Sequence, residues 1–80
     1  MSVNLVFLGK LADLAGAPEK DVAGPLDWGT LVAALPGPLG EALRGDKVKL
    51  AVNGTLLADK AALAAADGDE VALLPPVSGG

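Results

Sequence analysis

The residues best placed for chemistry lie at the C-terminus, where Pro75-Pro76-Val77-Ser78-Gly79-Gly80 carries no ionisable side chain. The two prolines favour a stiff, extended segment, whereas glycine has no Cβ and lets a backbone group approach reactive atoms closely. A terminal carboxylate at Gly80 could therefore pass through a narrow channel into the active site of another protein. This pattern predicts a tail whose own end is the reacting group.

A carboxylate is a poor electrophile, but adenylation by ATP converts it into a mixed anhydride with a good leaving group. A persulfide or sulfide can then produce a thiocarboxylate, which is ionised at neutral pH and nucleophilic. In this hypothesis Gly80 reacts, Gly79 gives it access, and an activating partner uses the ATP. We therefore expect no permanently bound cofactor. The alternative is an inert terminus, because a Gly-Gly end arises by chance in roughly 2% of chains this rich in glycine.

Composition excludes several other kinds of chemistry. The 80 residues include no cysteine and no histidine, so thiol nucleophiles, disulfides, structural zinc sites and Ser-His-Asp triads are absent. A net charge of −4 does not suit nucleic acid and would suit a basic protein partner. No apolar run approaches the roughly 20 residues needed to cross a membrane, and no signal peptide is recognised. We expect a cytoplasmic protein that binds neither nucleic acid nor membrane.

The first half of the chain predicts a strand, a weaker strand and a broken helix. Residues 3–8 read as a strand that is apolar on both faces, and residues 19–22 as a weak strand. A four-residue spacing of leucines between residues 31 and 43 indicates a buried helical face, with Asp27 or Thr30 as N-cap. Because proline disrupts a helix interior, Pro36-Gly37-Pro38 should divide this region into two short helices. The apolar positions are Leu31, Leu35, Leu39 and Leu43.

The second half predicts a hairpin and a final strand. Residues 47–53 alternate as a strand, and Asn53-Gly54 is a preferred two-residue hairpin turn. Residues 55–57 read as the short return strand of the hairpin, residues 61–66 as a brief helical connection, and residues 70–74 as the last strand. We interpret Asp67, Asp69 and Glu70 as turn formers rather than a metal site, since a calcium loop needs a longer ligand series. The order predicts an α+β fold with a sheet packed on a helical layer.

Three motifs resemble a known family. They are Val52-Asn53-Gly54-Thr55-Leu56, then Asp67-Gly68-Asp69-Glu70-Val71-Ala72, then the tail from Pro75 to Gly80. Together they are similar to the small, sulfur-carrying subunit of molybdopterin synthase (the MoaD type). The resemblance implies a ubiquitin-like β-grasp fold with a mixed four- to five-stranded sheet on a central helix. Residues 1–74 would form this domain and residues 75–80 a flexible Gly-Gly tail.

The resemblance also implies partners and a pathway. An activating enzyme of the MoeB type would adenylate Gly80, and the tail would enter a large subunit of the MoaE type, where sulfur passes to a cyclic pyranopterin in molybdopterin biosynthesis. The chain would thus be the non-catalytic, sulfur-donating subunit of that enzyme. The runners-up are a sulfur carrier for thiamine thiazole synthesis (the ThiS type), a ubiquitin-like protein modifier, and an interaction module with an inert tail. The implied partner-binding residues are Phe7, Leu73, Leu74, Pro75, Pro76, Val77 and Ser78.

Overall fold

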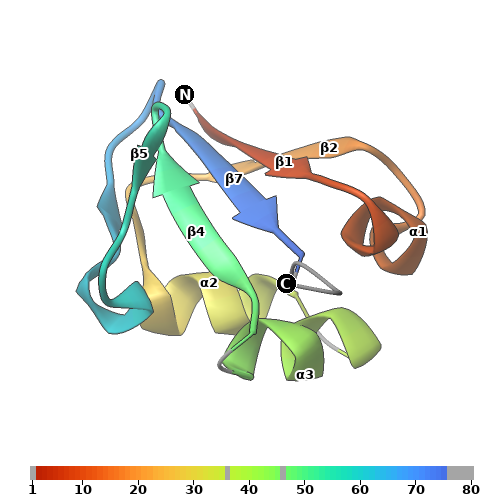
Figure 1. The fold of residues 1–80 in the computed structure, drawn as a ribbon. Coiled ribbons are helices and arrows are strands. Elements are labelled where there is room, and N and C mark those ends of the chain that lie inside the picture. Colours follow the sequence, from red (N-terminus) through yellow and green to blue (C-terminus); the bar gives the residue numbers. More distant parts are fainter. Residues whose placement is uncertain (1, 36, 46, 76–80) are drawn as a thin grey trace.

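A computed structural model of the chain describes residues 2–35, 37–45 and 47–75. Its main sheet has five strands in the order β2-β1-β7-β4-β5 (Figure 1). Strands β1 and β7 are parallel, whereas the other neighbouring pairs are antiparallel, so the sheet is mixed. The strands are β1 Ser2–Phe7, β2 Glu19–Ala23, β4 Lys49–Val52, β5 Thr55–Leu56 and β7 Glu70–Leu74.

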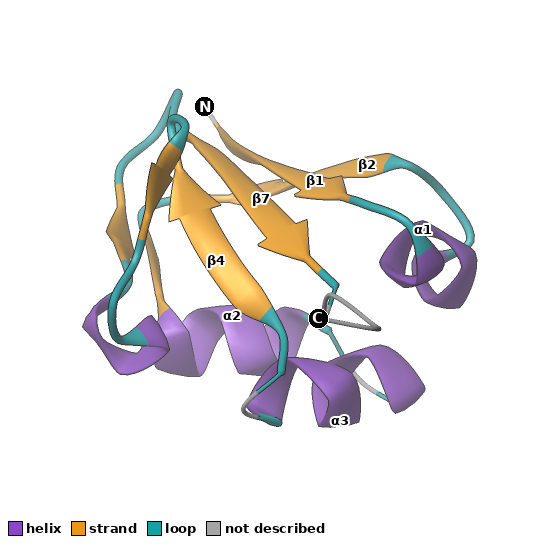
Figure 2. Cartoon of the chain, in the orientation of Figure 1, coloured by secondary structure: helices purple, strands orange, loops and turns teal. Residues whose placement is uncertain are grey.

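Helices cover one face of this sheet, and Figure 2 shows α2 and α3 lying beneath β4 and β7. A second sheet of two short strands, β3 Leu26–Asp27 and β6 Ala64–Ala65, is antiparallel. The expected α+β class, with a mixed sheet on a helical layer, is confirmed. The helices are α1 Lys10–Ala15, α2 Trp28–Ala34, α3 Pro38–Arg44 and the 3₁₀ helix η1 Lys60–Ala62.

The core lies between the sheet and these helices. Successive residues of a strand face opposite sides, and the first strand alternates between half-buried and buried positions along its whole length. All four leucines with the predicted four-residue spacing are buried. The sheet contributes Val3, Leu5, Phe7, Leu50, Val71 and Leu73, and the helical layer contributes Leu11, Leu31, Leu35, Leu39 and Leu43.

The predicted break in the helical region is confirmed. Helix α2 ends at Ala34, and α3 begins at Pro38, which tolerates the first helical position because no hydrogen bond is lost there. Asp27 is the N-cap of α2, since its carboxylate accepts a 2.8 Å hydrogen bond from the Thr30 N–H. Local capping chemistry therefore sets these helix limits.

The predicted Asn53-Gly54 turn is also confirmed. Both residues have positive φ, 50° and 86°, as a two-residue hairpin between antiparallel strands requires. The final strand covers residues 70–74 as predicted.

The connection before that strand differs from the prediction. Only Lys60–Ala62 is helical, and Ala64–Ala65 pairs with Leu26–Asp27 as a strand. The expectation of a helix over residues 61–66 was therefore wrong for its second half, because tertiary pairing overrides the helix propensity of alanine. Within the described residues, no helix is long and apolar enough to cross a membrane.

Candidate functional site

The candidate site begins where β7 ends, at Leu74 and Pro75. Strand β7 lies between β1 and β4, and Leu73 is opposite Phe7 on one side and Leu50 on the other. The Leu73 carbonyl also accepts a 3.3 Å hydrogen bond from the Leu8 N–H. The last described residues before the tail are thus held by neighbours on both sides, which gives the tail a fixed point of departure.

The structure separates the predicted partner-binding residues into two groups. Phe7 is 3% exposed and Leu73 is 0% exposed, so both side chains pack in the core and present almost no surface to a partner. Leu74 and Pro75 are half-buried and remain candidates for a contact. The other predicted site residues, Pro76, Val77, Ser78, Gly79 and Gly80, lie outside the described residues.

The strand pattern explains why Phe7 and Leu73 differ from Leu74. Side chains alternate along β7, with Val71 and Leu73 inward and Ala72 and Leu74 outward, as the sequence predicted. Phe7 is opposite Leu73 in the register and shares its inward face. Among the described residues, Leu74 and Pro75 therefore remain candidates for a partner contact, whereas Phe7 and Leu73 pack in the core of the domain.

An apolar patch on the outer face of the sheet continues from Leu74. Ala72 is opposite Val6 on β1 and Ala51 on β4, and Ala51 is in turn opposite Leu56 on β5. Leu56 is 61% exposed, an unusual position for a large apolar side chain next to other apolar residues. We call Val6, Ala51, Leu56, Ala72 and Leu74 the outer patch. Sequence reasoning missed the first four, because their proximity depends on strand order.

Charged residues border the outer patch. Asn4 donates hydrogen bonds to Glu19 at 3.2 Å and to Asp21 at 3.1 Å, so both carboxylates are held at the β1–β2 edge. Lys49 is opposite Leu74 near the end of β7. The outer patch therefore has an acidic border at β2 and a cation beside the end of β7, and the acidic border suits a basic partner.

A hydrogen-bond network fixes the start of β7. Asp69 accepts a 2.9 Å hydrogen bond from the Ala66 N–H and a 3.1 Å bond from the Asn53 side chain. Asn53 in turn accepts a 2.9 Å bond from the Glu70 N–H. The Ala66 bond, followed by that from Asn53, lowers the pKa of the Asp69 carboxyl. The predicted role of Asp69 in a turn is confirmed, and the network joins the hairpin to β7.

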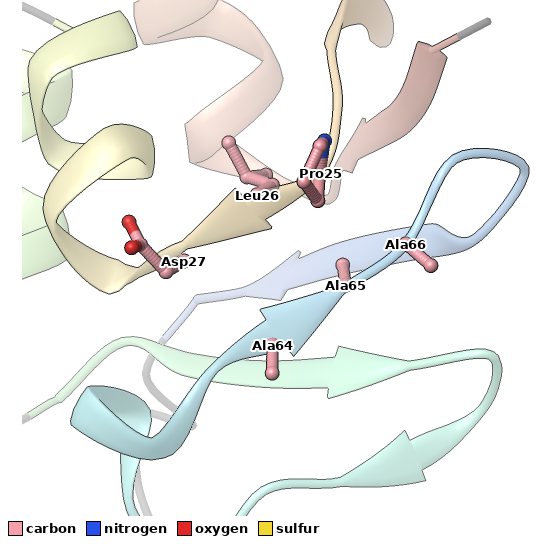
Figure 3. Close-up of a pocket in the computed structure, with 6 residues that line it drawn as sticks. All are labelled: Pro25, Leu26, Asp27, Ala64, Ala65 and Ala66. Atoms are coloured by element: carbon pink, nitrogen blue, oxygen red, sulfur yellow. The ribbon is translucent and has the colours of Figure 1, made fainter.

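One hollow on the described surface is almost wholly apolar. This hollow of about 290 Å³ lies against the paired strands β3 and β6, and Figure 3 shows that alanines, Pro25 and Leu26 line most of it. Its one ionisable group, Asp27, already caps α2. Among the described residues, no three potential metal ligands lie together. The chemistry of this hollow is therefore limited to packing.

Comparisons with known proteins agree with this geometry. The protein is similar to SAMP1 from Haloferax volcanii, with 33% identity, all of both chains covered and a TM-score of 0.68. A chain in the complex of subunits 1 and 2 of the molybdopterin-converting factor from Helicobacter pylori also matches. The identity is 28% and the TM-score 0.68, over 100% of this chain and 100% of that one. A further Haloferax volcanii protein gives 27% identity and a TM-score of 0.77, over 100% of this chain and 87% of that one.

No curated protein matches the chain. The profile of the ThiS family, however, matches residues 5–80, which is nearly the whole sequence. The structural neighbours confirm the expected β-grasp, ubiquitin-like fold. The chain therefore belongs to the ThiS family, in which sulfur carriers of the ThiS and MoaD types share a fold with ubiquitin-like modifiers.

Proposed function

We propose that this chain is a sulfur carrier whose C-terminal Gly80 is converted to a thiocarboxylate and donates its sulfur to a cyclic pyranopterin in molybdopterin biosynthesis. One observation supports this most directly. Strand β7 is fixed in the middle of the sheet and leads, through Pro75, to five further residues with no ionisable side chain. A firm base followed by a tail without bulky charge suits delivery of an acyl group into the active site of a partner.

The chemistry needs two partner-catalysed steps. In the first, an oxygen of the Gly80 carboxylate attacks the α-phosphate of ATP, pyrophosphate leaves, and an acyl adenylate forms. In the second, a sulfur nucleophile attacks the acyl carbon and AMP leaves; when the donor is a persulfide, a reductant of the thiol class releases the thiocarboxylate. The role of this chain is to bind, orient the tail and carry the sulfur, so the activating enzyme supplies the ATP site.

The molybdopterin assignment draws on the tail motif and on one neighbour. The Pro-Pro-Val-Ser-Gly-Gly end matches the pattern that resembles the MoaD type. The Helicobacter pylori neighbour is a complex of two subunits of a molybdopterin-converting factor. We propose a corresponding large-subunit partner for this chain, which contacts the outer patch near Leu74 and receives the tail. Pro75, Pro76, Val77 and Ser78 would line the path of insertion, with Gly79 beside the reacting Gly80.

A mass measurement tests the proposal. The purified chain is incubated with ATP, a MoeB-type activating enzyme and a sulfur source, and the intact protein is weighed. Exchange of one oxygen for sulfur at Gly80 is expected, and addition of a MoaE-type large subunit with the cyclic pyranopterin should restore the original mass. A chain lacking Gly80 is the matched control and should remain unmodified. If the complete chain also acquires no sulfur, the proposal is wrong.

A second function, ubiquitin-like modification of proteins, is favoured by the 33% identity to SAMP1 over both complete chains. The same activated Gly80 would then be attacked by a lysine amine, with loss of the activating group and formation of an isopeptide bond. The same incubation, with added cell protein, distinguishes the two. Isopeptide-linked species support the modifier. A thiocarboxylate consumed only when thiazole-forming enzymes are added would instead identify a ThiS-type carrier.

A further inference from the structure

A groove beside the base of the tail carries an inference about regulation. The groove has a volume of about 500 Å³ and lies between α1 and α3. Leu11 and Val48, each 3% exposed, are core residues that reach its wall, and Leu14 is 48% exposed. Ala42 and Pro75 add further apolar surface. The groove therefore leaves apolar surface uncovered directly where the described part of β7 leads into the tail.

We propose that this groove is a docking site for the chain's own segment from residue 76 to residue 80, which withdraws the reactive end between deliveries. The proposal deepens the proposed function and rests on it for one feature, a free carboxylate at Gly80. The apolar part of the docking depends only on the groove and on the residues that follow Pro75.

The position and length of the segment fit the groove. Pro75 is one of the lining residues, so the segment begins at the groove rather than at a distance from it. Five residues can extend over roughly 17 Å, whereas α1 and α3, with six and seven residues, are each about 10 Å long. The segment is long enough to follow the groove along both helices. Val77 supplies an apolar side chain to cover Leu14 and Ala42.

Charge fits as well. Lys10 and Lys47 line the groove together with one acid, Glu41. In the described part of the chain, neither lysine forms a salt bridge or a side-chain hydrogen bond. The segment contains no ionisable side chain, so the carboxylate of Gly80 would be its single charge. An anion at the end of an apolar segment complements an apolar groove with two cations at its border.

Tethering makes a weak contact sufficient. A segment joined to the groove through Pro75 has a millimolar effective concentration, so an affinity too low for a separate peptide still populates the docked state. A partner that takes the tail must then compete with the groove, and its apparent affinity falls in proportion to the undocked fraction. The result is a carrier that shields its reactive end until a partner draws it out.

A spin-label experiment tests the docking in the complete chain. Because the sequence contains no cysteine, Gly80→Cys gives a single attachment site for a nitroxide, whose effect is read on the backbone amide signals. We expect the strongest line broadening at amides of α1 and α3 around Leu14 and Ala42, and weaker broadening around Leu56 on the outer face. Leu14→Lys should reduce the α1 and α3 broadening at least twofold. The matched control, Leu56→Lys, changes a leucine that is also exposed, at 61% against 48% for Leu14, and should leave the broadening at α1 and α3 unchanged.

A charge-reversal variant provides an independent test. Lys10→Glu combined with Lys47→Glu should also weaken the broadening, as should 1 M salt. The proposal would be overturned if the amides of α1 and α3 and those around Leu56 were broadened equally, and if neither Leu14→Lys nor charge reversal altered this. Broadening at the groove that arises only when a large subunit is added would also overturn it, because the tail would then not occupy the groove in the free chain. A chain that docks its tail and never acquires sulfur contradicts the proposed function alone, and a chain that acquires sulfur without docking contradicts only this inference.

Discussion

The inward and outward faces of β7 perform different tasks within five residues. Val71 and Leu73 are 0% exposed and lie in the core between the sheet and the helices. Ala72 and Leu74 alternate with them and contribute to the outer patch. The same strand therefore secures the domain with one set of side chains and offers a surface with the other. Substitutions on the two faces should separate stability from partner binding.

The largest effect is expected on the inward face. Leu73→Ala removes a fully buried side chain and leaves a cavity, which typically lowers the free energy of unfolding by about 2–5 kcal/mol. For a domain of this size that is a large part of its total stability. Denaturant unfolding followed by circular dichroism measures the loss. A change below about 1 kcal/mol would show that Leu73 is not a core residue.

A pair of glycines extends the comparison to the helical layer. Gly40 in α3 is buried, and a Cβ there would collide with the Leu35 carbonyl oxygen. Gly29 in α2 is exposed, and the nearest atom to its added Cβ would be Asp27 Oδ1 at 3.8 Å. Helix propensity alone predicts that alanine stabilises both positions by up to about 1 kcal/mol.

We expect the two glycines to respond with opposite signs. Gly40→Ala should destabilise the protein by about 1–3 kcal/mol, because backbone must move to relieve the collision. Gly29→Ala should stabilise it by a few tenths to about 1 kcal/mol. Thermal unfolding of both variants beside the unmodified chain gives the result. Stabilisation by both would mean that α2 and α3 are not packed as closely as the structure shows.

The outward face should affect binding with little effect on folding. Leu74→Ala removes a half-buried side chain from the outer patch, so its free energy of unfolding should change by less than about 1 kcal/mol. If a large subunit covers this patch, affinity should fall by about tenfold, or about 1.4 kcal/mol. Titration calorimetry with the large subunit measures it. Ala33→Gly, an exposed position on α2, is no part of the patch and should leave the affinity unchanged.

The features predicted from sequence are those with local causes. Asn53-Gly54 sets the hairpin, Pro38 starts α3, and the alternation of residues 70–74 gives the last strand, because each depends on neighbouring residues. Pairing of β3 with β6 was missed, since two-residue strands far apart in the chain carry no local pattern. The contact of Lys60 with the end of α3 was also missed, because it joins segments far apart in the chain. The Lys60 ammonium group donates a 2.6 Å hydrogen bond to the Leu43 carbonyl and another to the Gly45 carbonyl.

The candidate site was likewise predictable where its cause is local and was missed where it depends on strand pairing. Motif and composition identified the tail and its reacting end, which needs no tertiary structure to recognise. The division of β7 into two faces also followed from alternation. The outer patch did not, because Val6 meets Ala72 only through the parallel pairing of β1 with β7, which brings together residues 66 positions apart. Phe7 was a partner candidate only through the family resemblance, and the structure places its side chain in the core, 3% exposed and opposite Leu73.

The smallest expected effect concerns Asp69, at the opposite end of β7 from the tail. Its carboxylate accepts hydrogen bonds from the Ala66 N–H and then from Asn53, and both lower its pKa in the folded protein. The unfolded chain should titrate near the usual aspartate value, about 3.9. The stabilisation is therefore fully present above that pH and is lost as the pH falls through the lower pKa of the folded state.

Asp69→Asn isolates this contribution, because Asp27 also has a lowered pKa and titrates in the same range. The variant should be less stable than the unmodified chain at pH 7, and the difference in the free energy of unfolding should shrink below about pH 4. Asp13→Asn is the control for removing a surface carboxylate, since the Asp13 side chain makes no hydrogen bond within the described residues, and it should change the free energy of unfolding at pH 7 by less than about 0.5 kcal/mol. If the difference in the free energy of unfolding between Asp69→Asn and the unmodified chain stayed constant across this range, the charge of Asp69 would contribute nothing to the stability of the Asn53–Asp69 network at the start of β7.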